Sequence, residues 1–298
     1  MPQPKALILE DRGVLAVEGP DGRSFLQGLI TNDVEKVDED RAIWAALLTP
    51  QGKFLHEFTI FQTEPEVLLL DCEAARLEDL KKRLSLYKLR SKVTVRDVSE
   101  SRFVAAFFGE GALDRLGLPS EAGKSAPLDG GRVAVDPRLG ELGARAVMIR
   151  SDVPPALNLQ GFAPATRADY DHLRISLGVP DGSRDLQVEK AILLENGFDE
   201  LHGIDWDKGC FMGQELTART RYRGLVKKRL LPVHFEGPTP ASGSQVTCDG
   251  KDAGTVFSSI GDQGLALLRL ERLKGPLLAG GTELTPLLPD WIALPEQA

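Results

Sequence analysis

The sequence predicts an α+β fold followed by a small all-β domain at the C-terminus. Strand-like apolar runs and short amphipathic helices are mixed through the first 225 residues. After Gly224 the pattern changes to short strands at close spacing, separated by Gly and Pro turns. A chain of 298 residues has the length of about two domains. We therefore expect an α+β body over residues 1–225 and a β-barrel or sandwich domain over residues 226–298.

The first elements are expected to be two strands and a helix. Residues 6–9 and 14–17 are apolar runs joined by Asp11-Arg12-Gly13, which predicts a β-hairpin. Residues 21–30 have an apolar side and predict a short helix with Asp21 as its N-cap.

Three strands and the clearest helix come next. Residues 43–49 and 54–61 predict two strands across a Pro50–Lys53 turn, and residues 67–70 predict a third. A helix is expected over residues 73–87, because four side chains repeat at helical spacing. They are Leu77, Leu80, Leu84 and Tyr87.

The rest of the chain continues the mixture. Residues 110–119 and 166–177 predict helices, the second of which ends at Gly178. Residues 120–131 are expected to form a polar connection, and residues 151–164 an irregular segment. The remaining expected strands cover residues 93–95, 103–108, 132–135, 144–149, 230–235, 245–248, 254–258 and 265–270.

Composition restricts the class of protein. A hydrophobic fraction of 42% with 27% charged residues is that of an ordinary globular protein. No apolar stretch approaches the ~18 residues of a membrane span, and the first residues lack the features of a signal peptide or a mitochondrial leader. We therefore expect a cytoplasmic protein with no membrane partner.

Basic residues gather in one part of an acidic chain. The net charge of −8 argues against a broad electrostatic grip on nucleic acid. Residues 208–229, however, contain seven basic residues and one acid, which predicts an anion site or a solvated surface. The basic residues are Lys208, Arg219, Arg221, Arg223, Lys227, Lys228 and Arg229, and the acid is Glu215.

Cys210 is the cysteine with the most informative surroundings. The three cysteines, Cys72, Cys210 and Cys248, are too few and too widely spaced for a disulfide framework or a zinc ligand set. A helix is expected to begin after Gly213 and to end at Gly224, which places Cys210 just before a helix N-terminus. That position and the nearby Lys208 favour a reactive thiolate. We expect the other two cysteines to be buried apolar residues.

Three segments resemble one known family. Residues 208–224 (KGCFMGQELTARTRYRG), residues 17–34 (VEGPDGRSFLQGLITNDV) and residues 87–93 (YKLRSKV) closely resemble the signatures of the YgfZ family. That family belongs to the folate-binding superfamily of the glycine-cleavage T-protein, an aminomethyltransferase, and includes assembly factors for iron–sulfur proteins. The sequence is similar to the mitochondrial-type members at residues 194–196 and 214–220.

The resemblance implies a fold, cofactors and roles for individual residues. It implies a ring-like T-protein fold with antiparallel sheets and a C-terminal β-barrel, around a cavity for tetrahydrofolate near which Cys210 would lie. Cys210 would be a metal ligand of a transient iron–sulfur cluster shared with a partner, with Lys208 beside it. A [4Fe–4S] cluster normally takes four thiolates, so one cysteine cannot hold it alone. The residues implied for folate are Gln214, Glu215, Arg219, Arg221, Arg223, Glu195 and Arg174.

The strand over residues 54–61 departs from the T-protein pattern. T-proteins use an aspartate after a Gly-rich turn to assist reaction at the folate amine, whereas the matching residues here are His56 and Glu57. Glu57 is the candidate catalytic carboxylate, although its longer side chain changes the geometry of proton transfer. His56 is expected to be a strand residue that faces solvent.

Three functions are compared on these grounds. The leading hypothesis is a tetrahydrofolate-binding accessory protein for assembly or repair of [4Fe–4S] proteins, which acts through Cys210 and affects tRNA modification only indirectly. Its expected partners are an A-type scaffold or client [4Fe–4S] proteins. The alternative is a folate-dependent aminomethyl or one-carbon transferase. A tRNA-binding enzyme is the least favoured, because no RNA-binding motif stands out.

Overall fold

The structure is a computed structural model of the chain and describes residues 3–150 and 161–294. The chain forms two compact units. The first unit comprises Met1–Leu48, Leu55–Arg167 and Leu201–Met212, and the second comprises Thr49–Phe54, Ala168–Glu200 and Gly213–Ala298. The division of the chain at residues 225 and 226 stays a prediction.

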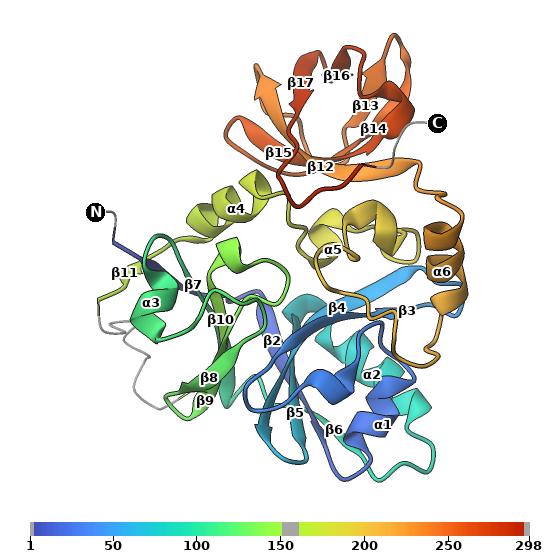
Figure 1. The fold of residues 1–298 in the computed structure, drawn as a ribbon. Coiled ribbons are helices and arrows are strands. Elements are labelled where there is room, and N and C mark those ends of the chain that lie inside the picture. Colours follow the sequence, from blue (N-terminus) through green and yellow to red (C-terminus); the bar gives the residue numbers. More distant parts are fainter. Residues whose placement is uncertain (1–2, 151–160, 295–298) are drawn as a thin grey trace. The chain divides into compact units, whose positions relative to one another are not determined.

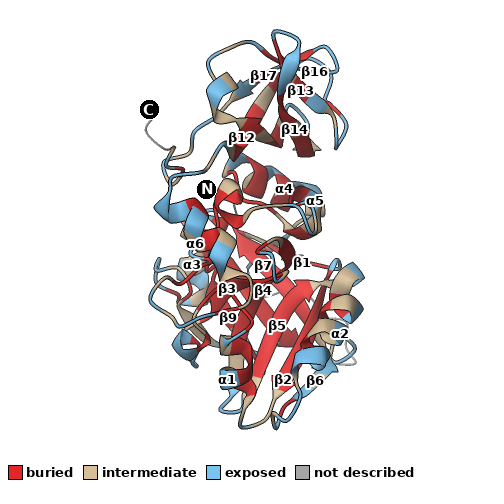
Figure 2. Cartoon of the chain, turned by 90° about the vertical axis from the view of Figure 1, so that its right-hand side faces the viewer, coloured by how far each residue is buried: buried red, intermediate tan, exposed pale blue. Residues whose placement is uncertain are grey.

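A five-stranded antiparallel sheet forms one part of the first unit. Its strands follow the order β3 (Ile43–Leu48), β4 (Phe54–Glu64), β5 (Val67–Glu73), β2 (Arg12–Glu18) and β6 (Thr94–Asp97). Figure 2 shows that β2 and β5 are buried along most of their length. Their apolar runs lack polar alternation, as is typical of strands covered on both faces. Helix α2 (Leu77–Tyr87) packs against β2 and β6 and contributes Leu77, Leu80 and Leu84 to the core (Figure 1).

A six-stranded sheet forms the other part of the first unit. Its order is β11 (Ala163–Pro164), β1 (Lys5–Ile8), β7 (Arg102–Phe108), β10 (Ala144–Ile149), β9 (Gly131–Val135) and β8 (Ser125–Leu128). Helix α3 (Ala112–Leu116) contacts β7. The polar connection expected over residues 120–131 is thus partly wrong, because β8 pairs with β9 there. Residues 151–160, within the segment expected to be irregular, lie outside the described residues.

The hairpin expected between residues 6 and 17 is wrong. Strand β1 pairs with β7 and β11, whereas β2 pairs with β5 and β6 in the other sheet. The expected turn residues Arg12 and Gly13 instead begin β2 and are buried. A Cβ atom at Gly13 would lie 2.6 Å from the Cδ1 atom of Leu77, so the glycine allows a close approach between β2 and the Leu77 side chain of α2 and does not form a turn.

The second unit combines short helices with a closed barrel. Its helices are α4 (Arg167–Ser176), α5 (Gly182–Asp185) and α6 (Gln214–Tyr222), and a 3-10 turn covers Leu193–Asn196. Six antiparallel strands close the barrel, so none of them has an unpaired long edge. In barrel order they are β12 (Lys228–Glu236), β15 (Gln263–Arg269), β14 (Lys251–Ile260), β13 (Gln245–Cys248), β16 (Leu277–Ala279) and β17 (Thr282–Pro286).

Buried aliphatic and aromatic side chains fill the barrel. Leu231, Val233 and Phe235 alternate with outward residues along β12 and are almost fully buried. Full burial of such a side chain stabilises a fold by about 1.5–3 kcal/mol. The small barrel therefore has a core of its own. None of the helices in the described ranges combines the length and apolarity that a membrane span requires.

Candidate functional site

Cys210 is exposed, whereas Cys72 and Cys248 are buried. Burial raises the pKa of the Cys72 thiol, and its sulfur lies 3.7 Å from the carbonyl oxygen of Gly13. Cys248 belongs to the barrel core. A thiol sealed in a core cannot reach a metal centre on another protein. Among the three cysteines, the side chain accessible to a partner is therefore that of Cys210.

The segment that carries Cys210 is fastened to the loop that follows α1 (Gly22–Gln27). Backbone hydrogen bonds join Asp205 N to Thr31 O over 3.1 Å and Met212 N to Gly28 O over 3.0 Å. The Thr31 hydroxyl donates to Gly203 O, and the Asn32 amide donates to His202 O. Cys210 thus lies between two residues, Asp205 and Met212, whose backbones are hydrogen-bonded within the first unit. Its side chain is exposed although the backbone on both sides is held.

Lys208 holds the same segment with its side chain. Its ammonium nitrogen donates to the carbonyl oxygens of Gln27, Ile30 and Asn32 over 2.9, 2.7 and 2.8 Å. The positive charge lies at the C-terminal end of α1, where the helix dipole favours a cation. Burial lowers the pKa of Lys208 to about 8, against the opposing effect of nearby carboxylates. An ammonium group has three N–H donors, and here each has a carbonyl oxygen as its acceptor. Lys208 therefore acts as a clamp that holds its own segment against the loop after α1.

Asp205 shapes the turn that leads to Cys210. One carboxylate oxygen accepts from the backbone N–H groups of Asp207 and Lys208 over 2.9 and 3.1 Å. The other oxygen pairs with the ammonium group of Lys36. Burial acts to raise the pKa of Asp205, but Lys36 and these N–H groups outweigh it and lower the pKa. Sequence reasoning missed Asp205, although an aspartate two and three residues before its N–H donors is an Asx-turn signal.

A cavity of about 410 Å³ lies beside this segment within the first unit. His202, Ile204 and Asp205 line it, but Cys210 does not. Trp44 and the cations Lys36 and Arg41 also line it. Pockets for small ligands are commonly of 300–1,000 Å³. The size is thus compatible with a small ligand.

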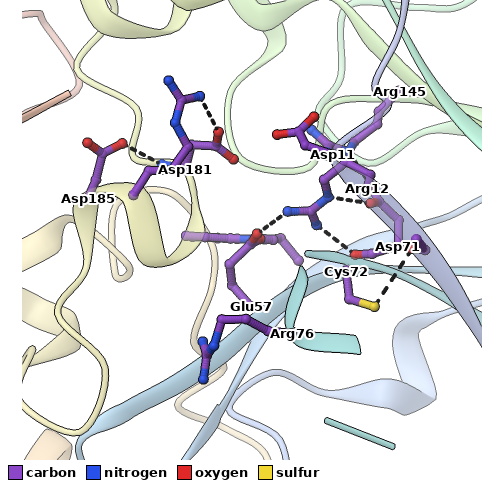
Figure 3. Close-up of polar contacts among 12 residues, drawn as sticks. Asp11, Arg12, Glu57, Asp71, Cys72, Arg76, Arg145, Asp181 and Asp185 are labelled. Atoms are coloured by element: carbon purple, nitrogen blue, oxygen red, sulfur yellow. Dashed lines mark hydrogen bonds and ion pairs between the residues drawn. The ribbon is translucent and has the colours of Figure 1, made fainter. Parts of the chain in front are cut away.

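Glu57 lies in a buried network of charges (Figure 3). Arg12 donates to one of its carboxylate oxygens and the indole N–H of Trp44 to the other, each over 2.5 Å. Arg12 also pairs with Asp71, which pairs in turn with Arg145. Burial acts to raise the pKa of Asp71, but the two arginines outweigh it and lower the pKa. Both carboxylate oxygens of Glu57 already accept hydrogen bonds from Arg12 and Trp44. Glu57 is therefore poorly suited to act as a general base toward folate.

His56 is on the opposite face of β4, where α2 covers it. The expectation that it faces solvent is wrong, because only 3% of the residue is exposed. Its Nε2 atom lies 2.9 Å from a carboxylate oxygen of Asp79. Burial and the charge of Arg76 lower the pKa of His56 to about 4 despite this carboxylate.

Helix α6 confirms the helix expected after Gly213. It runs over Gln214–Tyr222, with Gly213 at φ 80° before it and Gly224 at φ 59° after it. Thr217 and Thr220 face the interior. Most of the predicted anion-binding residues of this segment are exposed to solvent. Gln214 is half-buried and Arg223 is exposed. Glu215 pairs with Arg219, and Arg221 lies 3.8 Å from Asp199.

Arg174 and Glu195 have different surroundings. Arg174 is 1% exposed and binds Asp171, Asp185 and Ser258 within the second unit. Burial acts to lower the pKa of Arg174, but the carboxylates outweigh it and raise the pKa. Its burial and these contacts make Arg174 a packing residue rather than a folate contact. Glu195 is half-buried, and burial raises its pKa against the effect of Lys228 and Lys53.

Comparisons with known proteins decide the family. Residues 227–294 match the CAF17 C-terminal β-barrel domain. The mitochondrial iron–sulfur cluster assembly factor IBA57 of Mus musculus is 36% identical over 313 residues, covering 95% of this chain and 84% of that protein. The chain belongs to the IBA57 family. Human IBA57 has the same identity and coverage, and the Neurospora crassa homologue is 30% identical, covering 92% of this chain and 72% of its own.

The family membership confirms the resemblance to YgfZ and T-proteins. The crystal structure of the glycine cleavage system aminomethyltransferase T from Bartonella henselae matches with a TM-score of 0.78, covering 97% of this chain and 86% of that one. At 15% identity this match establishes the fold alone. The predicted α+β fold of the T-protein type with a C-terminal β-barrel is therefore confirmed.

The expected cytoplasmic location is contradicted, because the IBA57 relatives are named as mitochondrial proteins. Cell compartment is a property that composition does not determine.

The structure brings only some of the predicted site residues together. Lys208 and Cys210 share one fastened segment, whereas Glu57 belongs to the buried network of the two sheets. The remaining candidates are all in the second unit. No group of three or more His, Cys, Asp or Glu side chains able to hold a metal occurs within residues 3–150 and 161–294.

Proposed function

We propose that this IBA57-family protein takes part in the assembly or repair of iron–sulfur cluster proteins, with Cys210 as one ligand of a cluster shared with a partner. The names of the IBA57 relatives support a role in cluster assembly. The observation that carries the proposal is the exposed sulfur of Cys210 on a segment that hydrogen bonds hold on both sides. The cluster is the cargo of this reaction, and its other ligands come from the partner.

The chemistry asked of Cys210 is ligand exchange. Its thiol gives a proton to solvent, and the sulfur donates an electron pair to one iron of the partner's cluster as another ligand leaves. No electron transfer is required in this step. Lys208 contributes by holding the backbone, since its three N–H donors are bonded to carbonyl oxygens. The partner would be an A-type scaffold or a client [4Fe–4S] protein.

Tetrahydrofolate binding is the second part of the proposal. The T-protein fold and the arginines at the end of α6 and just after it support it, because Arg219, Arg221 and Arg223 can receive the carboxylates of a folate tail. Gln214, Glu215 and Glu195 remain candidates for the same ligand. Glu57 and Arg174 do not fit this role, because internal partners occupy them. We therefore propose no transferase reaction, and an effect on tRNA modification would be indirect.

A complementation experiment tests the role of Cys210. Cys210→Ser keeps the size of the side chain but removes the soft sulfur ligand. In a strain that lacks the endogenous protein, we expect this variant to leave the activity of a [4Fe–4S] enzyme at the level of the empty vector. Unfolding of the purified variant should match that of the wild type. Full restoration of enzyme activity by Cys210→Ser would disprove the proposed function.

A calorimetric titration tests folate binding separately. The wild-type chain, Cys210→Ser and a variant with Arg219, Arg221 and Arg223 changed to Gln are titrated with tetrahydrofolate. We expect binding to persist in Cys210→Ser and to weaken in the arginine variant. Absence of binding to the wild type would remove folate from the proposal and leave the role of Cys210 standing.

A further inference from the structure

Three large apolar side chains are exposed together around the end of α2. Leu86, Tyr87 and Leu89 are 67%, 41% and 89% exposed. They lie within residues 81–92, the segment we call the 81–92 surface. Single exposed leucines are common, but neighbouring exposed apolar side chains are typical of a surface that binds a partner. The proposed role of Cys210 does not use this surface.

The backbone presents Leu89 in an unfavourable conformation. Its φ angle of 42° lies in the left-handed region, which Gly and Asn adopt far more readily than a bulky residue. The loop around it is fixed, because Ser91 N donates to Lys88 O and Lys92 N donates to the carboxylate of Asp21 over 2.7 Å. A leucine that is both strained and exposed contributes little to folding, so its presence favours a binding role.

The charge of the same surface is opposite to that of the chain. Residues 81–92 contain six basic residues and no acid, while the whole chain has a net charge of −8. Lys81 pairs with Glu78 over 3.2 Å, and Arg83 pairs with Asp79 over 2.8 Å. In the described part of the chain, the other four cations form no ion pair. They are Lys82, Lys88, Arg90 and Lys92.

A hollow beside Leu89 indicates the kind of partner. Asp21, Leu89, Arg90 and Ser91 line it. Leu89 is part of the lining of this shallow, open depression, and hydrogen bonds fix the loop that carries it. A fixed surface relief suits a folded protein partner, whereas a bilayer surface is fluid and needs none. Tyr87 is the single aromatic residue of residues 81–92, which is a poor stacking platform for nucleic acid.

We propose that the 81–92 surface docks an acidic protein surface with an apolar centre, and that this protein is the partner which shares its cluster with Cys210. The inference rests on the proposed function, because it assigns the partner of that function a place on the first unit. Leu86, Tyr87 and Leu89 supply the apolar contact, and tyrosine is among the residues that carry most of the binding energy at interface centres. The four cations without an ion pair increase the rate at which an acidic partner associates, and they disfavour binding of basic proteins.

Binding of the full chain to a purified A-type scaffold tests the proposal by calorimetry. Leu89→Asn removes the apolar side chain while Asn still accepts the left-handed backbone, so the loop keeps its shape. We expect it to weaken binding about tenfold or more. Lys82→Glu with Arg90→Glu should weaken binding similarly and should reduce its dependence on salt. Lys251→Glu, an exposed cation of β14, is the control and should bind as the wild type does.

The outcomes separate this inference from the proposed function. Equal scaffold affinity in wild type, Leu89→Asn and the charge-reversed variant would overturn the docking surface, while loss of enzyme activity in Cys210→Ser would still support the proposed function. Binding of the wild type to vesicles with anionic lipid, lost in Leu89→Asn while scaffold affinity stays unchanged, would assign the surface to membranes instead. If the wild type binds neither the scaffold nor an apo-client protein, the docking proposal fails.

Discussion

The ammonium nitrogen of Lys208 lies 2.7 Å from the carbonyl oxygen of Ile30, a residue 178 positions earlier in the chain. With two further carbonyl contacts, it fastens the segment of Cys210 to the loop after α1. Hydrogen bonds to a charged group contribute about 1.5–3 kcal/mol each, and the cost of burying the ammonium offsets part of this. Lys208 is therefore best described as a residue that positions Cys210.

Lys208→Met should release this segment. We expect the free energy of unfolding to fall by about 2 kcal/mol, because three carbonyl oxygens lose their charged donor. Alkylation of Cys210 by a thiol reagent should change in rate, since the backbone on its N-terminal side is no longer held. Lys227→Met, at an exposed position, is the matched control. An unfolding free energy and an alkylation rate equal to those of the wild type would contradict the clamp.

Arg12 should be essential for stability, since it links two buried carboxylates. It pairs with Glu57 over 2.5 Å and with Asp71 over 2.6 Å. Arg12→Met leaves Glu57 without its cation, and removal of one partner from a buried pair costs about 3–5 kcal/mol. Chemical denaturation measures the loss. Arg269→Met breaks a partly exposed pair with Asp252 and should cost less than about 1 kcal/mol. Equal losses in the two variants would contradict the role of the network.

The pKa of His56 predicts a pH dependence of stability. Unfolded His56 takes up a proton near pH 6.5, whereas burial delays protonation of the folded form to about pH 4. The unfolded state therefore binds more protons between these values, and the free energy of unfolding falls as pH drops through this window, by up to about 3 kcal/mol. Denaturation at pH 7.5 and 4.5 measures the fall. It should be smaller in His56→Gln and unchanged in His234→Gln, whose ring is 42% exposed. The same fall in all three proteins would show that other groups cause it.

Local patterns predicted most of the individual elements. Helix α2 follows from the spacing of Leu77, Leu80 and Leu84, and the bounds of α6 follow from Gly213 and Gly224. Both signals lie within a few residues of the element that they define. Strand partners depend on contacts far along the chain. The apparent hairpin at residues 6–17 therefore gave no sign that β1 and β2 join different sheets.

At the candidate site too, the sequence does not reveal contacts between residues that are far apart along the chain. The motif around Cys210 identified an exposed sulfur, because glycines and cations next to a cysteine are visible in sequence. The partners of Lys208 are carbonyl oxygens near residue 30, which no side-chain pattern records. Likewise, an alternating strand pattern places His56 and Glu57 on opposite faces but does not show that both faces are covered. Tertiary packing decides which polar residues are free to meet a ligand.

Substitution of Arg174 tests whether this residue stabilises the fold or binds a ligand. Its guanidinium group joins Asp171 and Asp185 and donates to Ser258 over 2.8 Å. Arg174→Met should leave the buried carboxylate of Asp185 without its cation and lower the free energy of unfolding by about 3–5 kcal/mol. Arg184→Met is the matched control, because that side chain is 42% exposed and shares Asp171; its loss should be clearly smaller. Adding Asp185→Asn to Arg174→Met should recover part of the stability, since it removes the unpaired charge. If Arg174→Met instead unfolds like the wild type but binds tetrahydrofolate more weakly in calorimetry, then Arg174 is a ligand contact and its buried ion pairs are secondary.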